Sequence, residues 1–115
     1  TTIVQSISYT PTDAANIIYV EWTGTVVGSV NTSNMGFFLF SGSTLINAWA
    51  QGNISTSEPA QTTIKGYIVA GTTSSTTYAL YAAGTASIFF LSNTASTPYY
   101  NGSVGMELTV TEVVV

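Results

Sequence analysis

The sequence predicts an all-β fold, an antiparallel, jelly-roll-like sandwich of about eight strands that forms a single domain over residues 1–115. Residues that favour strands, β-branched and aromatic, dominate the chain, and no window of a dozen residues keeps the apolar spacing of an amphipathic helix. Clusters of Gly, Pro, Asn and Ser divide the chain into short segments at the spacing typical of sandwiches and jelly rolls.

The first two predicted strands carry clear turn and period-2 signals. The strand expected over residues 3–9 ends before Pro11, which cannot donate to a sheet ladder, and Asp13 can cap the turn that follows. In the strand expected over residues 17–27, apolar and polar side chains alternate. This alternation predicts one buried face, with Trp22 in the core.

The middle of the chain is expected to form five further strands, over residues 36–40, 45–51, 62–69, 77–82 and 87–91. The first of these is apolar on both faces and therefore needs cover on both sides. We expect Phe37, Phe38 and Phe40 to contribute to an oligomer interface. Trp49 is expected in the core.

The last strand begins with a strict alternation of apolar and polar residues over positions 104–111. The phase then breaks, because Glu112 falls on the apolar face and Val113 on the polar one. Either a β-bulge intervenes or the Glu112 carboxylate enters an oligomer interface, in which Val113 also takes part.

Charged residues make up only 5% of the chain, compared with about 25% in a typical soluble domain. The single basic residue, Lys65, cannot neutralise several phosphates, and the net charge is −4. These properties exclude nucleic acid as a partner. No apolar run approaches the roughly 20 residues of a membrane helix, so we expect no membrane insertion. A polar surface of hydroxyls and amides suits an extracellular or otherwise exposed location.

The residue inventory excludes most catalytic sites, because the chain has no His and no Cys. Phosphate-binding and dinucleotide-binding glycine loops are also missing. We therefore expect no catalytic residue, no metal and no cofactor. Two alternatives stay open: Thr1 as an N-terminal nucleophile, and a glycosidase pair. The carboxylates available for such a pair are Asp13, Glu21, Glu58, Glu107 and Glu112.

A second group of candidate residues lies in predicted loops. Tyr99, Tyr100 and Asn101 follow a proline, and aromatic faces and amides are the groups that recognise sugars, so we predict a receptor-binding or glycan-binding site there. Three Asn-x-Ser/Thr sequons, at Asn31, Asn53 and Asn101, would permit glycosylation.

Four short motifs occur in order along the chain. They are a Thr-Pro turn leading into an apolar strand (8–21), a Gly-Ser-Thr turn (38–46), Thr-Thr-Ser followed by Thr-Tyr (72–78), and Leu-Thr-Val-x-Glu-hydrophobe (108–113). This order resembles a domain found toward the C-terminal ends of bacteriophage and prophage tail-fibre proteins. The resemblance implies a jelly-roll-like sandwich that trimerises about a fibre axis on the virion surface, often for host attachment. Family members usually carry Arg or Lys in the middle strands, where this chain is nearly neutral.

Two other functions stay open beside a non-enzymatic structural domain of a viral fibre or spike. One is a subunit of an extracellular, pilus-like filament that donates a strand, suggested by the apolar residues 113–115 and the β-rich residues 1–4. The other is a carbohydrate-binding module. The expected partners are further copies of the chain and a host-surface glycan or protein. Sparse ionisable groups also predict stability that varies little between about pH 3 and 9.

Overall fold

The computed structural model describes residues 2–28, 33–54, 60–84, 88–90 and 105–115. Its strands are β1 (Thr2–Tyr9), β2 (Ile17–Gly28), β3 (Ser33–Ser41), β4 (Thr44–Ile54), β5 (Ala60–Val69), β6 (Thr76–Gly84), β7 (Ile88–Phe90) and β8 (Glu107–Val113). Within these ranges the regular structure is entirely β. The predicted all-β class and the count of about eight strands are confirmed.

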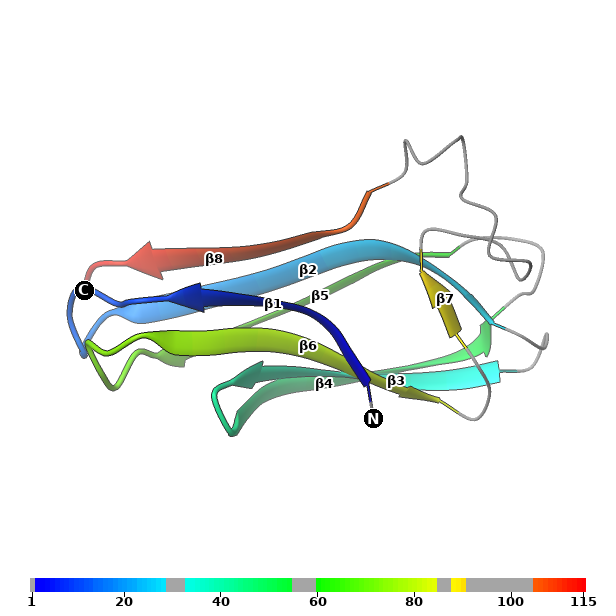
Figure 1. Ribbon diagram of the computed structural model, residues 1–115, viewed down its shortest axis with the longest axis horizontal. Coiled ribbons are helices and arrows are strands. Elements are labelled where there is room, and N and C mark those ends of the chain that lie inside the picture. Colours follow the sequence, from blue (N-terminus) through cyan, green and yellow to red (C-terminus); the bar gives the residue numbers. More distant parts are fainter. Residues whose placement is uncertain (1, 29–32, 55–59, 85–87, 91–104) are drawn as a thin grey trace.

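The strands form two antiparallel sheets (Figure 1). One sheet has the order β1-β6-β3-β4. In the other, β2 pairs with β5 along one edge, while β7 and β8 pair with different parts of its other edge. β3 and β4 form a hairpin within one sheet, whereas the chain passes between the sheets at each of the connections β1–β2, β2–β3, β4–β5, β5–β6 and β6–β7. The two sheets therefore form a β-sandwich.

The core lies between the two sheets and follows the period-2 alternation of the strands. Trp22 of β2 is fully buried, as predicted, and its ring lies 5.7 Å from that of Phe37 on β3 in the opposite sheet. The Trp22 indole N–H donates to the side-chain oxygen of Gln5 on β1, 3.1 Å away. These contacts join three strands of the two sheets. The buried cluster also includes Ile18, Val20, Val26, Met35, Leu39, Ile64, Tyr78, Leu80, Ala82 and Leu108.

Local backbone chemistry fixes the turns that the sequence predicts. Gly42, between β3 and β4, has a φ of 57°, and Gly71, after β5, has a φ of 70°, a region that side-chain-bearing residues rarely adopt. Asp13 caps the turn before β2, since its carboxylate accepts a hydrogen bond of 2.8 Å from the Ala15 N–H. The carbonyl of Asn16 in turn accepts a bond of 2.8 Å from the Ala70 N–H, which fixes this turn against the end of β5.

Two expectations about β4 are wrong. Trp49 is 54% exposed, not part of the core. It pairs with the buried Phe37 in the β3–β4 register, but β4 is an edge strand, so its side chain extends beyond the region that the two sheets cover. Asn53, expected in a loop, lies within β4, which continues three residues past the predicted end.

Gly24 on β2 provides a test of how tightly the core is packed. A Cβ atom at this position would overlap the Trp22 ring and lie 3.2 Å from the Cβ of Met106. We expect Gly24→Ala to lower the free energy of unfolding by about 1–3 kcal/mol in urea denaturation, because the core must shift to accept the methyl group. Gly105→Ala is the matched control, since a Cβ there meets nothing within 4 Å. Equal losses for the two variants would contradict this account of the packing.

Candidate functional site

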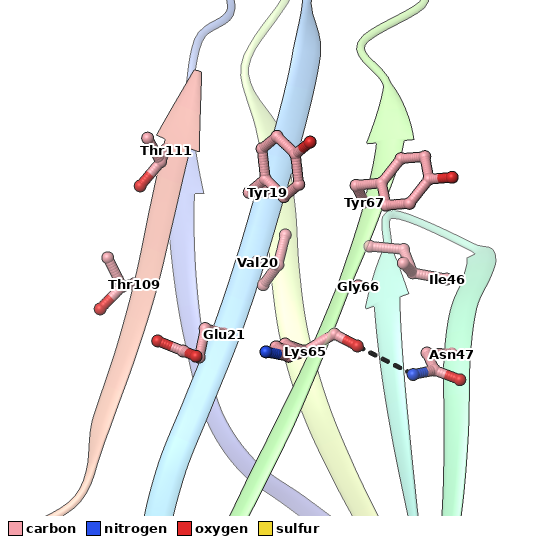
Figure 2. A pocket seen from close by; sticks show the side chains of 10 residues that line it. All are labelled: Tyr19, Val20, Glu21, Ile46, Asn47, Lys65, Gly66, Tyr67, Thr109 and Thr111. Atoms are coloured by element: carbon pink, nitrogen blue, oxygen red, sulfur yellow. Dashed lines mark hydrogen bonds between the residues drawn. The ribbon is translucent and has the colours of Figure 1, made fainter. Parts of the chain in front are cut away.

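A groove of about 820 Å³ crosses the outer face of the sheet that contains β2 (Figure 2). Its floor comes from three neighbouring strands, β8, β2 and β5, and one end is closed by β4 of the other sheet. The lining residues are Tyr19, Val20, Glu21, Ile46, Asn47, Lys65, Gly66, Tyr67, Thr109 and Thr111. The volume lies within the range of about 300–1,000 Å³ that is common for small-molecule sites.

Strand register brings the floor residues together. Successive side chains of a strand point to opposite faces, so the inward positions of β2 leave Tyr19 and Glu21 on the outer face. Tyr19 is paired with Tyr67 on β5, and Glu21 with Lys65. On the other side of β2, β8 contributes two threonine hydroxyls in the same two rows, at positions 111 and 109.

The two tyrosines form an exposed aromatic surface. Figure 2 shows their rings side by side on β2 and β5, with centroids 5.6 Å apart and planes tilted by 43°. Tyr19 is 48% exposed and Tyr67 66% exposed. Each tyrosine therefore presents part of its apolar face and its hydroxyl group at the surface.

The wall of the groove depends on the absence of a side chain at Gly66. A Cβ atom there would lie 2.7 Å from the Cγ2 of Ile46 and 3.3 Å from the Cβ of Asn47. Glycine therefore lets β4 approach β5 closely. The Asn47 side-chain amide then donates to the backbone carbonyl of Lys65 over 2.8 Å, which fixes the wall to the floor (Figure 2).

The charges in the groove are few and opposite in sign. Lys65, the single basic residue of the chain, is the cross-strand neighbour of Glu21. Glu21 is the one carboxylate that lines the groove among the described residues, and Glu107 instead accepts a hydrogen bond of 3.1 Å from the Thr109 hydroxyl. The described residues thus do not place two carboxyl groups across the groove, as a glycosidase requires. No cluster of three or more carboxylates that could hold a metal ion occurs among them either.

The loop residues predicted to bind a ligand, Tyr99, Tyr100 and Asn101, lie outside the described residues, as do Asn31, Glu58 and Thr1. The predictions for these positions stay untested. The sequence analysis does not predict Tyr19 and Tyr67 as site residues, because it looks for ligand-binding aromatic residues in a loop, at residues 99–101, and not within strands. The available signal was that Tyr19 alternates with the buried positions of β2 and shares the polar face with Glu21.

The residues expected in an oligomer interface separate into two groups. Phe37 points into the core and is fully buried within the chain, so it is not available to a partner. Phe38 and Phe40 lie on the opposite face of β3, half-buried on the outer surface of the sheet. Val113 is 41% exposed near the C-terminus. Two of the three phenylalanines thus remain candidates for a subunit contact.

Glu112 forms a hydrogen-bond network within the chain instead. Its carboxylate accepts bonds from the Tyr9 hydroxyl (2.6 Å), the Asn16 side-chain amide (2.6 Å), and the Thr12 N–H (2.9 and 3.1 Å) and hydroxyl (2.8 Å). The Val115 N–H donates to the Asn16 side chain over 3.4 Å, so the C-terminus lies beside the β1–β2 loop (Figure 1). We call this set of Tyr9, Thr12, Asn16 and Glu112 the Glu112 network.

The phase break at Glu112 coincides with this network within the chain, and the expected place of Glu112 in an oligomer interface stays a prediction. The register of β8 with β2 runs without a shift through Glu112, which excludes a bulge on this pair. Glu112 takes an inward position where the core ends and the polar β1–β2 loop begins. Hydrogen bonds lower the pKa of Glu112 to about 2, and the bond from the Tyr9 hydroxyl makes the largest contribution to this shift. The same bond raises the pKa of Tyr9, because it favours the protonated phenol.

Because of the Glu112 network, the free energy of unfolding should fall at low pH. The unfolded chain retains a pKa of about 4.5 for this carboxyl group, which is higher than in the folded state. Its stabilising contribution is therefore complete above about pH 5 and is lost as the pH falls toward about 2. Urea denaturation should show the free energy of unfolding falling across this window, contrary to the insensitivity expected down to pH 3. Glu112→Gln should remove this dependence, and an unchanged slope in that variant would contradict the assignment.

Glu112→Gln should also lower the melting temperature at neutral pH, because the amide cannot accept every bond that the carboxylate accepts and loses their charge-assisted strength. Glu107→Gln is the matched control on the same strand, since that carboxylate is exposed and accepts one local bond. In thermal melts followed by circular dichroism, the melting temperature of Glu112→Gln should lie well below that of Glu107→Gln. Equal melting temperatures would show that the network does not stabilise the fold.

Comparisons with known proteins do not identify the chain. No protein-family model matches it, and no curated protein matches it. In the part of the chain that the structure describes, no helix is long and apolar enough to cross a membrane. The resemblance to bacteriophage fibre domains thus stays a prediction, and any functional proposal depends on the surfaces and contacts of the chain itself.

Proposed function

We propose that the chain is a non-enzymatic structural domain of a viral fibre or spike that assembles as a homotrimer on the virion surface. One observation carries this proposal: the four strands β1, β6, β3 and β4 contain no charged residue, and aromatic side chains occupy the outer face of their sheet. Five of the chain's six charged residues lie in β2, β5, β8 and the loop at residues 10–16. The sixth, Glu58, lies outside the described residues.

The outer face of the uncharged sheet is suited to contact with another copy of the chain. Phe38 and Phe40 of β3 lie next to Tyr81 of β6, and the Phe40 and Tyr81 rings meet edge to face with centroids 5.4 Å apart. The register adds Ile3 opposite Tyr81 and Leu45 opposite Phe40, which are 49% and 50% exposed. A contiguous apolar surface of this kind is typical of protein interfaces. We call these five residues the apolar face.

The homotrimer and the virion location come from the resemblance to phage fibre domains, whose trimers would bury such a face. The missing His and Cys residues support a non-enzymatic role, as does the involvement of Glu112 in a structural network. The Glu112 carboxylate, whose pKa its hydrogen bonds lower, thus serves to hold the fold together.

A second candidate, a filament subunit that pairs strand to strand, is favoured by a different observation. β1 and β4 are the edges of their sheet and carry neither charge nor proline. Natural edge strands usually carry such residues, which prevent pairing with other chains. Electron microscopy separates the two candidates, because strand donation produces helical filaments whereas the proposed contact produces closed trimers.

The test of the proposed function is the mass of the purified chain in solution at micromolar concentration, measured by size-exclusion chromatography with light scattering. We expect a trimer, and we expect Phe40→Lys to dissociate it, since the new charge would be buried in the contact. Thr63→Lys is the matched control, because it adds the same charge to the outer face of the other sheet.

Phe38→Ser provides a second variant in case Phe40→Lys does not fold, as judged by circular dichroism. A wild-type chain that stays strictly monomeric would contradict the proposal. It would also be contradicted if Thr63→Lys dissociated the assembly as completely as Phe40→Lys.

A further inference from the structure

We propose that the groove across β8, β2 and β5 binds a neutral, hexose-based oligosaccharide, with Tyr19 and Tyr67 as its aromatic platform. The groove is built within one copy of the chain, so binding there does not depend on the proposed trimer. Its floor lies on the opposite sheet from the apolar face, and β4 of the sheet with the apolar face contributes only the wall residues Ile46 and Asn47.

The first argument is the pair of exposed rings. A pyranose ring has faces of C–H groups and an edge of hydroxyls, so it is best recognised by an aromatic face together with nearby polar groups. Tyr19 and Tyr67 are neighbours on adjacent strands, with centroids 5.6 Å apart. Two rings at this spacing, tilted by 43°, form a curved surface for a saccharide of more than one residue.

The second argument is the set of polar groups around the rings. The hydroxyls of Thr109 and Thr111 line one side of the groove and the Asn47 amide lines the other (Figure 2). Asn47 already donates to the Lys65 carbonyl, so its side chain is held in place before a ligand arrives. Hydroxyls and amides both donate and accept hydrogen bonds, which matches the mixed character of sugar hydroxyls.

The third argument is the charge balance, which favours a neutral ligand. Glu21 and Lys65 face each other as a cross-strand pair in the floor, so the groove itself carries no net charge. The chain as a whole carries −4, which disfavours sulfated or sialylated glycans and phosphorylated ligands. A carboxylate and an ammonium group remain able to bind sugar hydroxyls through charge-assisted hydrogen bonds.

The experiment uses a printed array of neutral oligosaccharides of hexoses and N-acetylhexosamines, with sialylated and sulfated glycans on the same array. The labelled chain is applied, and the strongest binder is then titrated by calorimetry and by ¹⁵N–¹H NMR. We expect neutral glycans to be bound, with shifted amide signals concentrated on β2, β5 and β8. Silence across the neutral glycans, a preference for the anionic ones, or shifts confined to other parts of the chain would each overturn the proposal.

Substitutions of the two tyrosines test whether their rings form the aromatic platform. We expect Tyr67→Ala and Tyr19→Ala each to raise the dissociation constant about tenfold, the loss of one stacking contact. Tyr67→Phe keeps the aromatic face and should weaken binding less than Tyr67→Ala. Trp49→Ala is the control, because it removes an exposed aromatic side chain outside the groove and should leave the dissociation constant unchanged.

Folding and assembly are measured on the same samples. Both tyrosines are exposed, so the variants should keep the wild-type circular dichroism spectrum, and the NMR map of the wild-type chain stays decisive if one of them does not fold. Tyrosine variants that lose trimers yet keep sugar binding would overturn the proposal and assign this sheet face to a subunit contact. Sugar binding by a monomeric wild-type chain would instead support the groove while contradicting the proposed trimer.

Discussion

The hydrogen bonds of the Glu112 carboxylate join the last strand of the sandwich to the region where the first strand ends. The acceptor is on the last strand, and the donors lie about a hundred residues earlier, Tyr9 at the end of β1 and Thr12 and Asn16 in the connection to β2. They hold β8 in one register against β2, and a slip of one residue would turn every side chain of β8 to the other face. Leu108 would then leave the core, and the threonine hydroxyls would leave the groove. A carboxylate on an inward-facing position is thus compatible with the fold because donors from Tyr9, Thr12 and Asn16 bind it.

Scarce charge gives the two sheets different surfaces. Every strand of the sheet β1-β6-β3-β4 is uncharged, while the other sheet carries Glu21, Lys65, Glu107 and Glu112. With six charged residues in the chain, such an unequal distribution changes what each face can contact: an uncharged aromatic surface favours association, and a surface with paired charges and hydroxyls favours water or a polar ligand. The sandwich therefore has an apolar outer side and a polar outer side, with the core between them.

Most of the fold could be predicted from the period-2 alternation of the strands and from the residue types in the turns. Alternation identified the buried face of β2 with Trp22, and the Gly42 turn and the Asp13 cap followed from residues whose backbone preferences are strong. Trp49 was misplaced because periodicity says which face a residue occupies, not whether its strand lies at an edge. The Glu112 network was unpredictable for a related reason: its donors are close only after the sandwich closes. The groove was missed likewise, since the approach of β4 to β5 at Gly66 depends on packing between the sheets.

The separation of the two outer faces has a consequence for the proposed trimer. If one sheet is buried against other copies, the opposite sheet faces outward from each copy, so every subunit presents the same groove. Identical sites on a symmetric assembly bind a multivalent surface far more tightly than one site does, because each further contact is intramolecular. The polar side of the sandwich is thus best understood together with the apolar side, since assembly through one would multiply binding at the other.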